Sequence, residues 1–164
     1  MIAETMTLTT SRFGEITVEP DGVLEFPRGL LGFEACTRFV LISSEEYEPF
    51  AHMQSLDDPS LLFVVVNPRL FVPHYRIEVD PREIAELGVT DVSQVAVWTI
   101  VTVPEDMSRM SINLQGPLLV NRDNNRGKQM VMVRSPYTTC HYIMDELQKL
   151  GARRPIAEAQ VAPV

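Results

Sequence analysis

The run Leu61-Leu62-Phe63-Val64-Val65-Val66 is the longest wholly apolar stretch of this 164-residue chain. It has the length of a β-strand and is far shorter than the ~20 residues that a membrane helix needs. β-branched and aromatic residues, which favour strands, make up most of it. The run therefore predicts a central strand over residues 62–66 that is buried on both faces.

Other segments that favour strands lie on both sides of this run, with turn-forming residues between them. They are Ile16–Val18, Leu24–Phe26, Phe39–Ile42, Ala96–Val103, Ser111–Leu114, Leu118–Val120 and Gln129–Val133. The turn Pro20-Asp21-Gly22 predicts a hairpin between the first two, because Pro presets φ and Gly supplies a positive φ. Short strands at such intervals favour a mainly β chain that forms a small antiparallel β-barrel-like or sandwich domain.

Two helices are expected to interrupt the β pattern. Asp80 suits the cap of the first helix, Pro81 suits its first position and Gly88 suits its end, so we expect one short helix near residues 81–87. A C-terminal helix is expected over residues 141–150, where apolar residues recur at helical spacing.

Composition is that of an ordinary globular protein, with 45% hydrophobic residues and a net charge of −8. We expect a single β domain over residues 1–151 and a flexible tail over residues 152–164, which are rich in Ala and Pro. The excess of acids argues against a dedicated nucleic-acid-binding protein, because neutralising phosphates needs a surplus of Lys and Arg.

Features that would place the chain outside the cytoplasm are not found in the sequence. Residues 1–11 hold no Lys or Arg and no apolar core, so we expect no secretory signal. The only two cysteines, Cys36 and Cys140, do not form a CxxC motif. We therefore expect free thiols in a reducing, cytoplasmic setting rather than a disulfide.

Charge is divided unevenly along the chain. Residues 1–107 hold 18 acids and 6 bases, whereas residues 108–164 hold 4 acids and 8 bases. This asymmetry predicts one acidic and one weakly basic surface region. An acidic region would speed association with a basic partner, although it would equally serve to keep the protein in solution.

The search for catalytic or metal-binding motifs gives little. The sequence has no GxGxxG, no Walker loop and no GxSxG, and its three histidines lack metal-ligand spacing. We therefore predict no catalytic residues, no metal and no cofactor. Asp57 and Asp58 suit a turn better than acid–base catalysis. The acids Glu45, Glu46 and Glu48 form either a solvated loop or a docking site for a basic protein.

A set of short blocks carries a family resemblance. The blocks are Phe13–Ile16, Phe26–Glu34, Gln54–Pro59, Phe63–Pro68, Ile100–Pro104, Asn113–Pro117 and Gly127–Gln129. In this order they resemble the bacterial flagellar assembly factor FliW, and they cover about residues 12–135. The resemblance implies a small antiparallel β-barrel-like fold, in agreement with the strand pattern.

The resemblance also implies a function. Such proteins are non-enzymatic partners of CsrA, a basic RNA-binding translational repressor, and they relieve its repression of flagellin mRNA. They also bind flagellin in a chaperone-like role, so that free flagellin releases CsrA. Direct contact with nucleic acid or membrane is not implied.

Candidate partner-binding residues come from the acidic loops and from polar positions in the family-like blocks. They are Glu45, Glu46, Glu48, Asp57, Asp58, Asn113, Gln115 and Lys128. We expect the carboxylates to face CsrA. Two alternatives stay open at this point. A small-ligand-binding β-barrel would show a large apolar pocket, and a hydrolase using Asp57 or Asp58 would show a buried carboxylate of raised pKa.

Overall fold

The computed structural model describes residues 4–153, and in that range the chain is mainly β. The strands are β1 (Met6–Thr10), β2 (Gly14–Val18), β3 (Val23–Glu25), β4 (Arg38–Ile42), β5 (Ala51–Ser55), β6 (Leu62–Val66), β7 (Val95–Thr102), β8 (Ser111–Ile112), β9 (Leu118–Asn121), β10 (Arg126–Gln129) and β11 (His141–Tyr142). The helices are α1 (Pro81–Ala85) and α2 (Ile143–Arg153). Short 3-10 turns are η1 (Pro20–Gly22), η2 (Glu45–Tyr47), η3 (Pro68–Leu70), η4 (Val92–Gln94) and η5 (Met107–Arg109).

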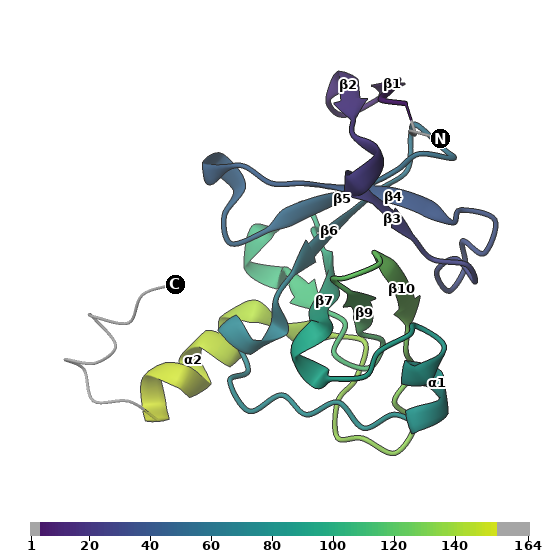
Figure 1. The fold of residues 1–164 in the computed structure, drawn as a ribbon. Helices are drawn as coiled ribbons and strands as arrows, with labels where there is room; N and C mark the ends of the chain where they lie inside the picture. The colour runs from purple at the N-terminus through teal and green to yellow at the C-terminus, as the bar shows by residue number, and fades with distance from the viewer. Residues whose placement is uncertain (1–3, 154–164) are drawn as a thin grey trace.

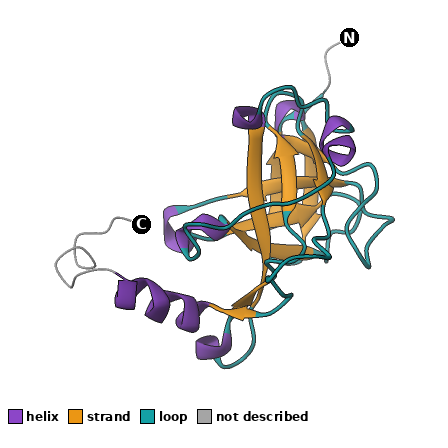
Figure 2. Cartoon of the chain, turned by 90° about the horizontal axis from the view of Figure 1, so that it is seen from below, coloured by secondary structure: helices purple, strands orange, loops and turns teal. Residues whose placement is uncertain are grey.

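Seven of these strands close into a barrel, as Figures 1 and 2 show. Their order is β7-β6-β5-β4-β3-β10-β9, and β9 pairs back onto β7. The long strand β7 makes this closure possible, because Val95–Trp98 pair with β9 while Thr99–Val101 pair with β6. All of these pairs are antiparallel except β3–β10, where the single parallel pair Glu25–Arg126 forms the seam. The predicted mainly β, barrel-like fold is therefore confirmed.

The barrel interior is filled by side chains. Phe26, Phe39 and Leu118 have no exposed surface, and the two phenylalanine rings meet edge to face at 5.7 Å between centroids. Gly127 on β10 leaves room for Phe26, because a Cβ at that position would lie 2.6 Å from the ring. This close approach fixes where β10 can run past β3.

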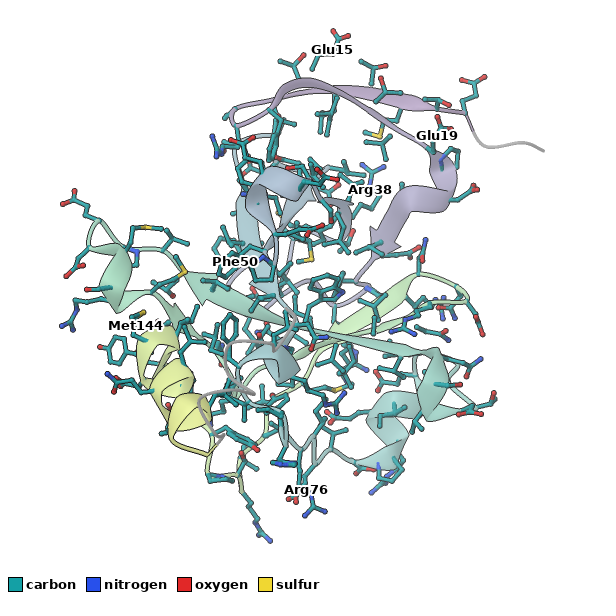
Figure 3. The ribbon with its side chains drawn as sticks, turned by 90° about the vertical axis from the view of Figure 1, so that its left-hand side faces the viewer. Glu15, Glu19, Arg38, Phe50, Arg76 and Met144 are labelled. Atoms are coloured by element: carbon teal, nitrogen blue, oxygen red, sulfur yellow. The ribbon has the colours of Figure 1, made fainter. Side chains whose placement is uncertain are left out.

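Three elements extend the barrel. The hairpin β1–β2 stands at one end of the molecule, as Figure 3 shows. The strands β8 and β11 extend the sheet beyond β7, and α2 follows β11 directly. In Figure 2, α2 lies outside the barrel wall.

Some local predictions differ from the structure. The hairpin predicted around Pro20–Gly22 is wrong, since β2 pairs with β1 and β3 pairs with β4 and β10. Gly22 is not among the described residues with a positive φ, and the segment forms the turn η1 instead. The strands β1 and β5 were not predicted, and the sequence Ala-His-Met-Gln-Ser of β5 lacks the β-branched and aromatic residues on which the prediction relied.

Other boundaries shift by a few residues. The first helix ends at Ala85 rather than residue 87, with the Asp80 side chain accepting from the Arg82 N–H as predicted. The strand predicted over Gln129–Val133 ends at Gln129. The C-terminal helix starts two residues later than predicted and continues to Arg153. Both cysteines are free thiols, as predicted. Of the predicted tail, residues 152–164, the first two belong to α2, and residues 154–164 lie outside the described residues.

Candidate partner-binding surface

Acidic residues gather on the part of the chain that forms β1 to β5. Residues 4–61 hold 11 acids and 3 bases, whereas the remaining residues hold as many bases as acids. Glu15 and Glu19 project from the β1–β2 end of the molecule in Figure 3, and Arg76 lies at the opposite end. The acidic excess of the chain therefore lies on the segment that forms the first five strands, while the rest of the chain is balanced in charge.

The loop between β4 and β5 carries three free carboxylates. We call residues 43–50 the acidic loop. Glu45 and Glu46 lie in the turn η2, Glu48 follows it, and all three are exposed. Among the described residues, none of the three forms an ion pair. These side chains are therefore available to a partner without first breaking a contact of the protein's own.

An aromatic cluster of Phe13, Tyr47 and His52 holds the acidic loop in place. The ring of Tyr47 lies 4.7 Å from the ring of His52 on β5, and Phe13 lies 5.2 Å from the same imidazole. The guanidinium of Arg12 lies 5.7 Å from the Phe13 ring and 5.8 Å from the Tyr47 ring. Burial, together with the nearby charge of Arg12, lowers the pKa of His52. A neutral His52 therefore supports the loop near neutral pH.

A second acidic loop lies at the other end of β5. We call residues 56–61 the Asp loop. Asp57 accepts hydrogen bonds from the N–H groups of Thr37 at 2.8 Å and Arg38 at 3.0 Å, and from the Arg38 guanidinium at 3.1 Å. Burial alone would raise the pKa of Asp57, but these hydrogen bonds outweigh it and lower that pKa. The carboxylate of Asp57 is thus committed to fixing the start of β4.

Asp58 closes the Asp loop on itself. Its carboxylate accepts from the Ser60 hydroxyl at 2.7 Å and the Ser60 N–H at 3.0 Å, and these bonds lower its pKa. The Ser55 hydroxyl accepts from the Asp57 and Asp58 N–H groups. Both aspartates therefore have lowered pKa values, whereas the hydrolase alternative required a raised one.

The tip of the β1–β2 hairpin lies between the two acidic loops. The Ser11 N–H donates to the Pro59 carbonyl at 3.1 Å, and Arg12 contacts Tyr47 in the acidic loop. The Thr10 side chain holds this tip, accepting from the Phe13 N–H and donating to the Gly14 carbonyl. The two loops are thus linked through the hairpin tip.

The remaining predicted contact residues make internal contacts. Asn113 accepts from the N–H groups of Gln115 at 3.1 Å and Gly116 at 2.9 Å, which sets the turn before β9. Lys128 binds Glu83 at 3.4 Å and Glu86 at 3.1 Å, and only 13% of its side chain is exposed. These contacts tie β10 to α1 and give Lys128 and Asn113 structural roles in this fold.

In the described part of the chain, buried side chains such as Phe26, Phe39 and Leu118 fill the barrel interior. This observation does not favour the small-ligand alternative. A surface hollow with a volume of about 670 Å³ lies between residues 77–83 and 131–135. Among residues 4–153, no group of three His, Cys, Asp or Glu side chains is placed to hold a metal ion. No helix in the described part of the chain is long and apolar enough to span a membrane.

Comparisons with known proteins give a consistent result. The family model described as FliW protein matches residues 7–143. A protein of Alkaliphilus metalliredigens named flagellar assembly factor FliW is 39% identical over 88% of this chain and 90% of its own length. The proteins of that name from Treponema pallidum and Geobacter sulfurreducens are each 38% identical over 90% of this chain, and cover 98% and 92% of their own lengths. A crystal structure of the flagellar assembly factor FliW superposes with a TM-score of 0.79 at 30% identity, covering 84% of this chain and 96% of that one.

Proposed function

The chain belongs to the FliW family of flagellar assembly factors, and from this premise we propose that it is a non-enzymatic, cytoplasmic regulator that binds CsrA and flagellin in turn. When CsrA is bound, its repression of flagellin mRNA is relieved. When free flagellin accumulates, it occupies the protein in a chaperone-like complex and CsrA is released. The protein acts without cofactor, nucleic acid or membrane.

The observation that carries the CsrA part of this proposal is the acidic loop. Its three glutamates are exposed and free of ion pairs among the described residues, and they stand on the acidic side of the molecule. A basic RNA-binding protein has the complementary charge. Complementary charge on two surfaces steers encounter and fixes orientation more than it adds raw affinity.

A physical mechanism for the antagonism follows from the same charge. An acidic protein docked beside the RNA groove of CsrA repels incoming phosphates and lowers RNA affinity without filling the groove. This repulsion acts within a Debye length, ~8 Å at physiological salt. The antagonism of RNA binding should therefore weaken as salt is added. Antagonism that is flat across a salt series, with the protein–protein complex intact, would favour a conformational mechanism instead.

The proposed contact residues differ in how they contribute. Glu45, Glu46 and Glu48 contact CsrA directly, and Asp58 lies at the margin of the contact. Asp57 contributes by fixing the Asp loop to β4. The polar residues Asn113, Gln115 and Lys128 contribute by holding the turn before β9 and the β10–α1 packing, on which the shape of the surface depends.

The test is a calorimetric titration of the full chain with CsrA from the same genome, repeated after saturation with flagellin. We expect tight binding to CsrA that flagellin abolishes. Binding to flagellin without heat from CsrA would leave a chaperone and remove the regulatory part of the proposal. If neither CsrA nor flagellin gives measurable heat of binding, the proposal as a whole is overturned.

A further inference from the structure

The loop after β7 and the helix α2 leave the sheet at the same edge. Thr102 on β7 pairs with Ser111 on β8, and Ser111 pairs with Tyr142 on β11. The loop that carries η5 therefore begins and ends at the edge where α2 begins. The Ile143 N–H, at the start of α2, donates to the Met110 carbonyl at 3.0 Å. The turn η5 and the first turn of α2 are thus packed together and form one surface.

Large apolar side chains are exposed on both of these elements. The exposed fractions are 46% for Val103, 57% for Met107, 50% for Met144 and 43% for Leu147. We call these four residues the methionine face. Apolar residues scattered singly over a surface are ordinary, whereas apolar residues gathered on elements that touch indicate an interaction surface. Methionine suits such a surface, because its flexible and polarizable side chain adapts to the shape of an apolar partner.

The two flanks of α2 differ in what they face. One flank carries Glu146 and Lys149, which line a hollow of about 330 Å³ against residues 71–74. Met144 and Leu147 are three positions apart and lie on the flank turned away from Lys149, because each residue of a helix advances by about 100°. Figure 3 shows Met144 at the outer margin of the molecule, at the start of α2. The apolar flank of α2 therefore faces solvent next to η5.

The methionine face has an acidic border. Glu105 and Asp106 lie in the loop that carries η5, Asp145 lies on α2, and all three are exposed. Within the described residues, none of these three acids forms an ion pair. Arg109 is the base of the same loop, and its guanidinium donates to the Tyr142 hydroxyl at 3.1 Å and lies 5.4 Å from the centre of that ring. The border thus presents free carboxylates, and the partner with complementary charge is basic.

We propose that the methionine face receives an amphipathic helix of a partner protein whose polar side is basic. Apolar residues of that helix, spaced at i, i+3 or i+4, and i+7, pack on Met107, Met144 and Leu147. Lys or Arg residues beside its apolar stripe meet Glu105 and Asp145. In recognition of this kind the apolar anchors supply most of the affinity, and the charges fix the orientation of the bound helix.

A second copy of this chain fits the methionine face less well than a basic helix. Contact between two such faces would bring the acidic borders of both copies together, and like charges at an interface disfavour association. The surface is also formed by elements other than the acidic loop between β4 and β5. The family model ends at residue 143, so nearly all of α2 lies outside the part of the chain that it matches. The inference therefore does not rest on the proposed binding of CsrA and flagellin.

The first experiment uses a blocked synthetic peptide of leucine and lysine, with the leucines spaced to form one apolar stripe on a helix. The full chain is labelled with ¹³C on the methionine methyl groups and titrated by NMR. We expect the Met107 and Met144 methyl signals to shift, while those of buried Met53 and Met130 stay in place. Absence of a shift at Met107 and Met144 would overturn the proposal.

Two further peptides test the chemistry of the partner. A peptide with glutamate in place of lysine should bind about tenfold more weakly, which corresponds to ~1.4 kcal/mol. A peptide of the same composition, with its leucines spread around the helix, should not shift the methyl signals of the methionine face. Equal binding of either peptide would overturn the proposal, because the apolar stripe or the basic charge would then be irrelevant.

Variants of the chain supply the second experiment, in which calorimetry measures the affinity for the leucine–lysine peptide. Met144→Gln with Leu147→Gln keeps the charge of the surface and removes its apolar groups, and we expect binding at least about tenfold weaker. The matched control is Leu31→Gln with Val92→Gln, which removes two exposed apolar side chains elsewhere and should leave binding unchanged. An unchanged Met53 methyl signal verifies the fold of both variants. Undiminished binding in the first variant, or an equal loss in the control, would overturn the proposal.

Two other outcomes separate this surface from its alternatives. The variant with Glu45, Glu46 and Glu48 replaced by Gln should bind the peptide as the unaltered chain does. A loss equal to that of the Met144 and Leu147 variant would assign the peptide to the acidic loop and overturn the proposal. Sedimentation of the unaltered chain tests for a second copy. A dimer that the Met144 and Leu147 variant disperses would assign the methionine face to self-association and also overturn the proposal.

Discussion

The two acidic loops at opposite ends of β5 have similar composition and different chemistry. In the Asp loop, Asp57 accepts from two backbone N–H groups and one guanidinium, and Asp58 accepts from its own turn. In the acidic loop, the three glutamates accept from nothing that the structure describes. The comparison teaches that acidic residues on one surface divide into those that hold the fold and those that remain free for recognition.

The largest expected effect comes from removing the Asp57 carboxylate. Asp57→Ala leaves the Thr37 and Arg38 N–H groups and the Arg38 guanidinium without their acceptor. We expect the free energy of unfolding to fall by about 2 kcal/mol, as for other hydrogen bonds to charged groups. Urea denaturation measures it. Asp57→Asn keeps one acceptor oxygen and should lose less. An unchanged midpoint in Asp57→Ala would place Asp57 with the free carboxylates.

The next effect is on binding rather than on stability. Replacing Glu45, Glu46 and Glu48 together by Gln should weaken CsrA binding about tenfold at low salt, because several exposed charge pairs of up to ~1 kcal/mol each are lost. The free energy of unfolding should change by no more than ~0.5 kcal/mol. Calorimetry and urea denaturation measure the two quantities. The matched control is Glu15→Gln with Glu19→Gln, which removes acids from the β1–β2 hairpin. If the control weakens binding equally, total charge and not the acidic loop is responsible.

The stabilising contribution of the Asp57 carboxylate should also depend on pH. The pKa of Asp57 is lower in the folded state than its ordinary value of 3.8. Its contribution to stability is therefore present above that ordinary value and is lost as pH falls through the lower, folded value. We expect Asp57→Asn to flatten the acid limb of a stability–pH curve relative to that of the unaltered protein. An acid limb of unchanged slope in Asp57→Asn would contradict the assignment.

The smallest effect concerns the support of the acidic loop. The pKa of His52 is lower in the folded state than its ordinary value of 6.5. The unfolded chain therefore takes up a proton first, and stability declines as pH falls below 6.5 and levels off below the folded pKa. His52→Phe retains an aromatic ring beside Tyr47 and removes the titration, so its stability should decline less between about pH 7.5 and pH 5.5. Thermal unfolding at both values measures it, and parallel declines in the two proteins would contradict this role.

The fold was largely readable from the sequence, and the site only in part. Apolar β-branched runs predicted β6, β7 and β9, because burial in a sheet selects those side chains directly. The strand β5 escaped prediction because its place in the barrel is set by pairing with β4 and β6 rather than by its own composition. The turn-forming sequence at Pro20–Gly22 predicted that β2 pairs with β3, whereas β2 pairs with β1. Local turn chemistry indicates where the chain turns but does not determine which strand pairs with which.

The roles of the carboxylates could not be read in this way. Besides the Arg38 guanidinium, the partners of Asp57 are backbone N–H groups of residues 37 and 38, which any amino acid other than proline would supply. The sequence therefore shows the acid but not its acceptor role, which depends on the barrel bringing the two segments together. The free state of Glu45, Glu46 and Glu48 is likewise a property of the folded surface.

The seam between β3 and β10 has a consequence for how the protein is made. Glu25 and Arg126 are joined by the only parallel pair of the barrel, across about a hundred residues of chain. Contacts between such distant residues form late in folding, because the entropy of closing a long loop is lost before these contacts can stabilise the chain. During synthesis on the ribosome, β3 to β6 are made first and form an open sheet, and the barrel stays incomplete until β7, β9 and β10 have been made. Barrel closure thus waits for β10, and a nascent chain exposes two unpaired sheet edges until that strand is made.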